Sequence, residues 1–327
     1  MHDYGITLQD VYQARGRIQG LVRHTYLQHS PWLSSHSGRR VWLKLENLQL
    51  TGSFKIRGAA NTLLSLSAEQ KERGVLAFST GNHGRAVAYV AHQLGVRAVV
   101  CLSKRVPDYR VQAMEALGAE VVRSGESQDE ASVKAAELER EEGLTMIKPF
   151  DDPLIIAGQG TIGLELLEDL PEVDTLLVPL SGGGLMAGVA YVAKQVNPGI
   201  RTIGLSLEVS APMHESIKAG EPVEIDEVDS IGDALLGGIG LDNAYTFPLV
   251  RDMVDEILLL SEEEIADGLV SLFREHRLVA EGAGIVGVSA LMHKQGLELG
   301  SRVAAVVSGG NMDPELLVQL CSKRFNQ

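Results

Sequence analysis

Short apolar runs alternate with longer stretches of helical periodicity from about residue 40 onward. Several runs, such as "RAVVCLS" and "RVAAVVS", are nearly continuous Val, Leu and Ala, which is typical of strands buried on both faces of a parallel sheet. Strands are expected at 40–46, 74–79, 97–103, 119–124, 174–180, 201–207, 255–260 and 302–308. Helices are expected between them, among others at 84–95, 131–143, 185–196 and 261–277. This alternation predicts an α/β fold with mostly parallel, twisted sheets flanked by helices.

The chain has 327 residues, which is long for a single hydrophobic core. The block 74–147 contains three or four strand–helix units of its own, and "KPFDDP" at 148–153 is a proline-bounded turn that returns the chain to the larger body. We expect two lobes, a large domain formed by 1–73 with 149–327 and a small domain formed by 74–148. A cleft between two such lobes is a common place for ligands.

Composition narrows the range of partners. Lys and Arg total 29 against 43 Asp and Glu, a net charge of −14, and such an acidic surface argues against a nucleic-acid partner. No apolar run is long enough to span a bilayer, and the N-terminus lacks the pattern of a secretory signal. Two cysteines make no disulfide framework. We therefore expect a cytoplasmic protein that binds neither nucleic acid nor membrane.

Three successive glycines, Gly182, Gly183 and Gly184, lie in "PLSGGGLMAG", between an expected strand and an expected helix. Backbone N–H groups of such a loop can approach an anion closely at a helix N-terminus. The spacing fits the dinucleotide fingerprint only in its looser form, with Ala187 in the third place and Glu208 as a late acidic residue. A compact monophosphate site is therefore favoured. A pyrophosphate loop and a purely structural turn stay open as alternatives.

A second loop, "STGNHGRA", also follows an expected strand and concentrates polar groups in Ser79, Thr80, Asn82 and His83. Hydroxyls and backbone N–H groups at the start of a helix suit a carboxylate, and α/β sheets bind ligands at the carboxyl ends of their strands. We favour a carboxylate site over a cluster of N-cap residues, because a cap needs only one of them. The motif "VVSGGN", which contains Ser308, is by itself an ordinary exit from a strand.

Lys55 lies directly behind a Gly-Ser-Phe turn in "LENLQLTGSFKIRGA", at the start of an expected helix. A cation in the first turn is at the unfavourable end of the helix dipole, and its neighbour Phe54 is apolar, so the turn is not simply surface. A solvated lysine is the alternative. A lysine, a phosphate site and a carboxylate site together suggest pyridoxal phosphate. This cofactor needs an amine for a Schiff base, donors for its phosphate and a place for the substrate carboxylate.

With these motifs in order, the chain resembles the pyridoxal-phosphate-dependent threonine/serine dehydratases of fold type II, the tryptophan synthase β-like group. The resemblance is carried by "LKLENLQLTGSFKIRGA", "STGNHGRA", "KPFDDPLIIAGQGTIGLELL", "PLSGGGL" and "VVSGGN", which span about residues 40 to 311. It implies a two-lobed fold in which the large domain binds the cofactor, and a small amino-acid substrate. We also expect a homodimer.

The resemblance implies roles by position. Lys55 would form the Schiff base with the cofactor and move the α-proton of the substrate. Phe54 would pack against the cofactor ring, Asn82 would hydrogen-bond its phenolic oxygen, and Ser308 would face the pyridine nitrogen. The phosphate would be bound by backbone groups of Gly182, Gly183, Gly184 and Leu185. The substrate carboxylate would be held by Ser79, Thr80, Asn82 and His83.

The chain departs from the family at a cation site. Many relatives carry Val-Glu-Pro and a following Asp, whereas here Ser206 replaces the Glu and Pro212 falls where the Asp would be. Hard divalent cations require several oxygen ligands with negative charge, so we expect no metal at this place. The serine racemases are similar too, but the serine that they use as a second base aligns with Thr80, which puts racemisation in doubt.

Another departure concerns the substrate. Relatives often have Asp-Gly where this chain has Asp233 and Ala234, and Gly237 and Gly238 follow in a stretch that we expect to border the cleft. Missing side chains would leave room for a substrate larger than serine, unless the glycines only make a tight turn. The stretch resembles the dehydratases of hydroxyectoine utilisation. Hydroxyectoine itself lacks a free primary α-amine, so a ring-opened 3-hydroxy-2,4-diaminobutyrate derivative is the form that the chemistry could use.

The sequence therefore predicts a pyridoxal-phosphate lyase that eliminates water from a β-hydroxy α-amino acid, with a ring-opened hydroxyectoine derivative as the candidate substrate. One alternative is an L-threonine/L-serine ammonia-lyase. The other, outside enzymes, is an anion- or nucleotide-binding module that uses the glycine loop. Lys55 separates the enzymes from the module, because a binding module has no need of it.

Overall fold

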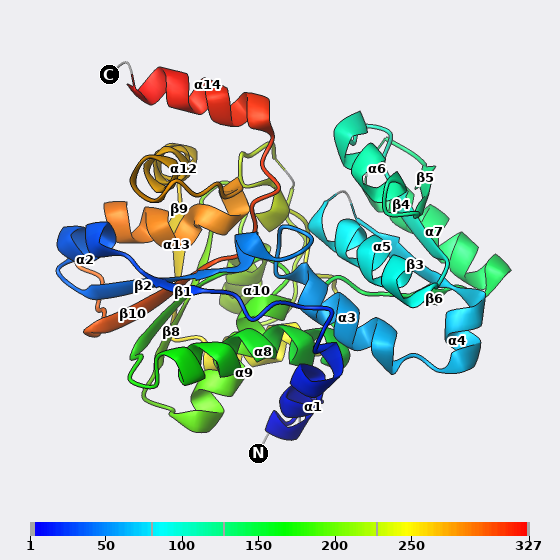
Figure 1. Cartoon of the computed structure of the whole chain (residues 1–327), viewed down its shortest axis with the longest axis horizontal. Helices are drawn as coiled ribbons and strands as arrows, with labels where there is room; N and C mark the ends of the chain where they lie inside the picture. The colour runs from blue at the N-terminus through cyan, green and yellow to red at the C-terminus, as the bar shows by residue number, and fades with distance from the viewer. Residues whose placement is uncertain (1–3, 80, 127, 227, 326–327) are drawn as a thin grey trace.

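The computed structural model describes residues 4–79, 81–126, 128–226 and 228–325, and its strands form two separate sheets (Figure 1). The strands are β1 (Leu27–His29), β2 (Arg40–Leu45), β3 (Val75–Phe78), β4 (Ala98–Leu102), β5 (Glu120–Arg123), β6 (Thr145–Met146), β7 (Thr175–Pro179), β8 (Arg201–Leu207), β9 (Glu256–Leu260) and β10 (Arg302–Val307). Each of the strands expected from the sequence is present, with its ends within about one residue of the expected ones.

Helices connect the strands and cover both sheets. They are α1 (Leu8–Ile18), α2 (Pro31–Ser37), α3 (Lys55–Ser65), α4 (Ala68–Arg73), α5 (Asn82–Leu94), α6 (Asp108–Glu115), α7 (Gln128–Glu142), α8 (Pro153–Asp169), α9 (Gly184–Val196), α10 (Pro212–Ala219), α11 (Thr246–Met253), α12 (Glu262–His276), α13 (Gly282–His293) and α14 (Pro314–Phe325), with the short 3-10 helices η1 (Glu46–Leu48) and η2 (Asp233–Leu235). In the part of the chain described, no helix is both long and apolar enough to cross a membrane.

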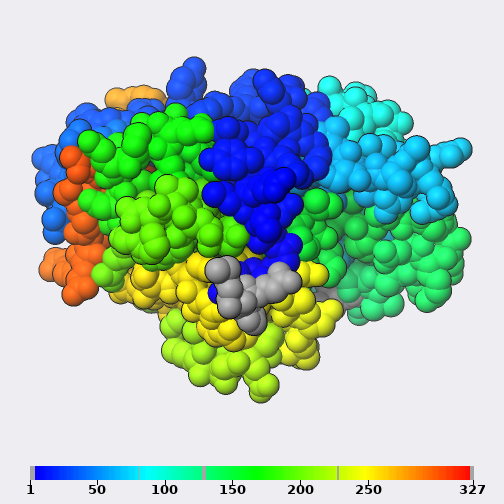
Figure 2. Space-filling view, turned by 90° about the horizontal axis from the view of Figure 1, so that it is seen from below, coloured from blue at the N-terminus to red at the C-terminus, as the bar shows by residue number. Residues whose placement is uncertain are grey.

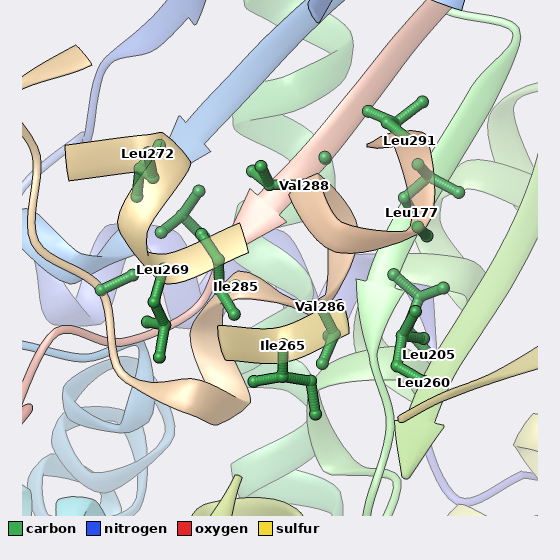
Figure 3. Packing of buried hydrophobic residues seen from close by; sticks show 14 of the residues in the cluster. Leu177, Leu205, Leu260, Ile265, Leu269, Leu272, Ile285, Val286, Val288 and Leu291 are labelled. Carbon is green, nitrogen blue, oxygen red and sulfur yellow. The ribbon is translucent and has the colours of Figure 1, made fainter. Parts of the chain in front are cut away.

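The larger sheet has six strands in the order β1-β2-β10-β7-β8-β9, and every neighbouring pair is parallel except β1 with β2. Both of its faces are buried, as the continuous apolar runs predict. On one face Leu177, Leu205 and Leu260 pack against α12 and α13 (Figure 3). On the other face Val178 and Val306 pack against α9 and its neighbours.

The smaller sheet has four parallel strands in the order β5-β4-β3-β6, all drawn from one continuous stretch of chain. Helix α5 covers one face and α7 the other. In Figure 1 this part, coloured cyan to green, lies to one side of the six-stranded sheet. The strands of the smaller sheet fall between the expected domain boundaries at 73/74 and 148/149, and the division into two domains stays a prediction.

Helix α8 packs at very short range against two other helices. A Cβ atom added at Gly158 would lie 2.7 Å from the Arg57 carbonyl oxygen, and one at Gly188 would lie 2.5 Å from the Ile156 carbonyl oxygen. Glycine therefore lets α8 contact both α3 and α9 backbone to backbone. Helix α1 lies on α8 through Val11 and covers this junction. Figure 2 shows the N-terminal segment in blue over the middle of that face, between the green and the cyan parts of the chain.

A cluster of buried charges fixes α3 relative to α8. The guanidinium of Arg57, on α3, donates to both carboxylate oxygens of Glu46 at 2.8 Å and to those of Glu165 at 2.6 and 2.8 Å. Lys44 Nζ lies 2.6 Å from Glu165 Oε2 and donates to the Thr25 carbonyl. Arg57 is 1% exposed and Lys44 and Glu46 are fully buried. Each charge is paired, so the cluster holds one geometry of the helix that begins at Lys55.

We expect Arg57→Met to lower the free energy of unfolding by about 3–5 kcal/mol, because two buried carboxylates then lose their shared partner. Urea unfolding followed by circular dichroism measures the change. The matched control is Glu69→Ala, which breaks the exposed Arg73–Glu69 pair and should cost less than about 1 kcal/mol. Equal effects of the two substitutions would contradict the anchoring role.

Candidate active site

A cavity of about 470 Å³ lies between the two sheets, at the carboxyl ends of β3, β7 and β10. This is where ligands bind in α/β proteins. The cavity brings together residues that lie far apart in the sequence. Among its lining residues are these predicted site residues: Phe54, Lys55, Ser79, Asn82, His83, Gly182, Gly183, Gly184, Leu185 and Ser308. Thr80, also predicted, lies outside the described residues.

Lys55 is the first residue of α3, and its amine reaches the cavity. Lys55 Nζ donates to the carbonyl oxygen of Pro149 at 2.8 Å and lies 5.4 Å from the centre of the Phe54 ring. Burial lowers the pKa of Lys55 to about 8, an effect that the charge of Glu281 partly opposes. The amine is therefore uncharged in a large fraction of molecules at mildly alkaline pH, as a nucleophile or a proton carrier must be.

The triple-glycine loop has a shape that only glycine can adopt. Gly183 is the N-cap of α9 in a left-handed conformation, with φ of 90°. A Cβ atom at Gly182 would lie 2.4 Å from Phe150 Cδ1, and one at Gly183 would lie 2.8 Å from Met213 Cε. No side chain caps the first turn of α9. Its N–H groups are therefore available to an anion in the cavity.

The loop that begins at Ser79 differs in detail from the expectation. Gly81 is the N-cap of α5, and no side chain caps that helix, so its polar residues are not an N-cap cluster. His83 is buried, and its Nε2 lies 2.8 Å from the carbonyl oxygen of Ile147. Because a carbonyl only accepts, Nε2 carries the proton. Burial, and then the charge of Lys55, lower the pKa of His83 to about 3, so the imidazole is neutral and holds the loop rather than offering a cation to a carboxylate.

Residues 147–152, here called the crossover segment, link these parts. Its carbonyl oxygens at Ile147 and Pro149 accept hydrogen bonds from His83 and Lys55. Its Phe150 side chain lies against the triple-glycine loop. Its Asp151 carboxylate accepts from the backbone N–H groups of residues 244, 245 and 246 at 2.9–3.0 Å. The Thr246 hydroxyl in turn donates to the Gly182 carbonyl at 2.8 Å.

Ser308 directly follows β10 and lines the cavity. Its expected role at the pyridine nitrogen stays a prediction. Ser308 is 3% exposed, and its carbonyl oxygen accepts from the Phe54 N–H at 3.0 Å. The strand end and the lysine turn are therefore held side by side. A hydroxyl at this place is a weak hydrogen-bonding partner that carries no charge.

The sequence reasoning missed four charged residues that line the cavity, Arg85, Arg110, Asp233 and Glu281. Arg110 Nη2, on α6, lies 2.6 Å from Asp233 Oδ2, on η2, so the pair spans the space between the two sheets. Glu281 precedes α13, and burial together with the charge of Asp233 raises its pKa to about 7. The only sequence signal for Glu281 is a carboxylate directly before the small-residue helix "GAGIVGVSA".

The structure lends no support to the expectation that Gly237 and Gly238 border the substrate, which stays a prediction. Residues 233–236 line the cavity, whereas neither glycine is among its lining residues. Gly237 has φ of 94°, which favours glycine for backbone reasons alone. A Cβ atom at Gly238 would meet no atom closer than the Gly240 nitrogen, at 4.0 Å. A turn at an open position is therefore enough to explain the pair of glycines.

The residues at the expected cation site offer no carboxylate. Ser206 is buried in β8, and Pro212 is the first residue of α10. In the described ranges no three His, Cys, Asp or Glu side chains gather as metal ligands do. The absence of a metal requirement stays a prediction.

Comparisons with known proteins agree with this geometry. The family model described as "Pyridoxal-phosphate dependent enzyme" matches residues 18–309. A putative threonine dehydratase of Sinorhizobium fredii is 47% identical over 308 residues, 94% of this chain and 93% of the relative. The L-threonine ammonia-lyase of Thermotoga maritima is 40% identical, over 97% of this chain and 79% of the relative.

Solved structures match almost the whole chain. Maize serine racemase superimposes with a TM-score of 0.91 at 32% identity and covers 98% of both chains. The T.th. threonine deaminase superimposes with a TM-score of 0.87 at 37% identity, over 94% of this chain and 99% of that chain. The α/β fold with mostly parallel sheets and flanking helices is thereby confirmed.

We expect Gly183→Ala to weaken the binding of pyridoxal phosphate roughly tenfold, because a left-handed residue with a Cβ costs about 1–2 kcal/mol. The added methyl group would also press on Met213. Equilibrium titration of cofactor-free protein measures the affinity. Gly16→Ala, on an exposed part of α1 with no atom within 4 Å of the added Cβ, is the control. Unchanged affinity in Gly183→Ala would show that the loop is not the phosphate site.

Proposed function

The chain belongs to the pyridoxal-phosphate-dependent enzymes of fold type II, in the group of the threonine dehydratases and serine racemases, and we propose that it is an ammonia-lyase for L-threonine and L-serine. The proposal rests chiefly on one observation. Lys55, with its lowered pKa, shares a cavity with an uncapped glycine loop and with the hydroxyl of Ser308. The names of the most similar relatives support threonine as the substrate.

The residues that line the cavity fit pyridoxal phosphate. The Cβ-free loop at 182–184 and the first turn of α9 suit its phosphate, and Phe54 offers an aromatic face to its ring. Ser308 and Asn82 offer polar groups for the ring nitrogen and the phenolic oxygen. Bound there, the cofactor supplies a conjugated sink for the electron pair that is left when the α-proton departs.

The chemistry of the chain itself then follows from three features. Lys55 can accept a proton near neutral pH because burial lowers its pKa to about 8. Ser308, a neutral hydroxyl, does not hold a proton on the ring nitrogen as a carboxylate would, which favours prompt loss of the β-hydroxyl. Part of the cavity wall is apolar, formed by Ala113, Met114 and Leu235. Elimination of water followed by hydrolysis gives a 2-oxo acid and ammonia.

A second candidate substrate is a β-hydroxy amino acid with another amino group, such as a 3-hydroxy-2,4-diaminobutyrate derivative. The resemblance to the dehydratases of hydroxyectoine utilisation suggests it, although neither Gly237 nor Gly238 is among the residues that line the cavity. The observation that favours it is the charged wall formed by Asp233 and Arg110. The side chain of threonine needs no charged partner, whereas a second amine would find one in the Asp233 carboxylate.

We expect cofactor-free protein to capture pyridoxal phosphate covalently on Lys55, with a rate that rises with pH and levels off above about 8. The uncharged amine is the reacting form. Because the pKa of Lys55 is lowered from 10.5 to about 8, this form becomes abundant at a lower pH than in an ordinary lysine. Stopped-flow absorbance measures the rate, and borohydride reduction with peptide mapping locates the label. Lys55→Ala is the control and should lose capture and turnover. A label on another lysine would refute the assignment.

We expect L-threonine to give 2-oxobutanoate and ammonia with a higher kcat/KM than a 3-hydroxy-2,4-diaminobutyrate derivative. Coupled assays of both products on the wild-type protein and on Asp233→Asn make the comparison. A wild-type preference for the diamino substrate, reduced roughly tenfold or more in Asp233→Asn while L-threonine turnover is largely kept, would favour the second candidate.

A further inference from the structure

Glu281 is a buried carboxylate to which the reaction outlined above assigns no role. It is 7% exposed and lines the cavity. It is the N-cap residue of α13, yet its side chain does not cap that helix. A Cβ atom at Gly309 would lie only 2.2 Å from Glu281 Oε1, so the backbone at Gly309 leaves the space that the carboxylate fills. A buried carboxylate is costly unless it is hydrogen-bonded, which raises the question of its partner.

The carboxylate is hydrogen-bonded by the backbone of Asn311 and by the side chain of Asn82, which belongs to a hydrogen-bonded chain of fixed direction. Asn82 Nδ2 donates to Glu281 Oε1 at 2.5 Å, and Asn82 Oδ1 accepts from Asn311 Nδ2 at 2.6 Å. Asn311 Nδ2 also donates to the Thr51 carbonyl at 2.9 Å, and Asn311 Oδ1 accepts from Arg85 Nη1 at 2.8 Å. A carbonyl only accepts and a guanidinium only donates. Neither side-chain amide can therefore exchange the positions of its oxygen and nitrogen without loss of these hydrogen bonds.

These hydrogen bonds use one of the two N–H groups of Asn82 Nδ2. The other has no partner among the described residues, and Asn82 lines the cavity. We propose that Glu281 is a positioning residue that holds the Asn82 amide with this N–H directed at the phenolic oxygen of bound pyridoxal phosphate. The inference rests on the proposed function for the place of the cofactor. Glu281 acts through Asn82 and does not itself touch the reacting atoms.

The contact also joins the two sides of the cavity. Asn82 begins α5, which covers the four-stranded sheet. Glu281 precedes α13, which packs on the six-stranded sheet, and Asn311 follows β10 of that sheet. Other charges also influence this carboxyl group: that of Asp233 raises the pKa of Glu281 and that of Arg110 lowers it. The charge of Glu281 in turn raises the pKa of Lys55. An oxygen of the carboxyl group accepts from Asn82 whether or not the group is protonated. The alignment of the amide is therefore independent of the charge of Glu281.

A double-mutant cycle tests the proposal with Glu281→Leu, Asn82→Ala and the double variant. The readouts are the visible spectrum of the bound cofactor and its dissociation constant, both taken without substrate. Each single variant should shift the spectrum and weaken cofactor binding roughly tenfold or more. The double variant should match Asn82→Ala, because a residue that acts through the amide has no effect once the amide is gone. Glu281→Gln, which keeps an acceptor oxygen, should retain the wild-type spectrum.

Thermal unfolding of the cofactor-free variants separates positioning from a merely structural role. Removal of a buried carboxylate should leave the melting temperature unchanged or raise it, while cofactor binding falls. If Glu281→Leu does not fold, Glu281→Ala and Glu281→Gln provide the same comparison. Additive losses in the double variant, or a Glu281→Gln spectrum as altered as that of Glu281→Leu, would overturn the proposal. Failure of L-threonine turnover alone would leave these readouts intact and would count against the proposed substrate only.

Discussion

A single guanidinium buried between two carboxylates determines where the reactive lysine lies. Arg57 follows Lys55 by two residues, and its guanidinium makes four hydrogen bonds to Glu46 and Glu165, which come from η1 and α8. It also donates to the Thr161 hydroxyl and to the Arg23 carbonyl. Such a cluster adds little to the free energy of unfolding compared with apolar packing. Any other placement of its side chains would leave a buried charge without a partner, which is strongly unfavourable. Together with the glycine contacts between α3 and α8, the cluster fixes the first turn of α3, and with it the amine, relative to the large sheet.

The crossover segment extends this fixed frame to the rest of the cavity. Its carbonyl groups accept from Lys55 and His83, its Phe150 ring fills the space beside the triple-glycine loop, and its Asp151 holds the backbone that follows η2. Groups from both sheets therefore meet on one short stretch of chain. This explains how side chains that belong to separate sheets can be aligned closely enough for catalysis, which requires placement to a fraction of an ångström.

The parts of the site that the sequence predicted are those with a local signal. Lys55 and the glycine loop follow from a turn at a helix start, and the long strands follow from continuous apolar runs; β1 and β6 have only three and two residues and leave no such pattern. Glu281, Asp233 and Arg110 could not be found in this way, because their roles come from contacts between distant segments. The burial of His83 could not be read from its neighbours in the sequence. The role of Gly237 and Gly238 could not be read either, because a turn and a close approach both select glycine.

The order of the strands has a consequence for the way the chain folds as it is made. The four-stranded sheet is complete within residues 75–146, so its contacts can form early and locally. By contrast β2 pairs with β10, more than 250 residues later, and the six-stranded sheet lacks its middle until nearly the whole chain has left the ribosome. Until then the edges of β2 and β7 present unpaired backbone N–H and C=O groups, and the arrival of β10 covers both at once.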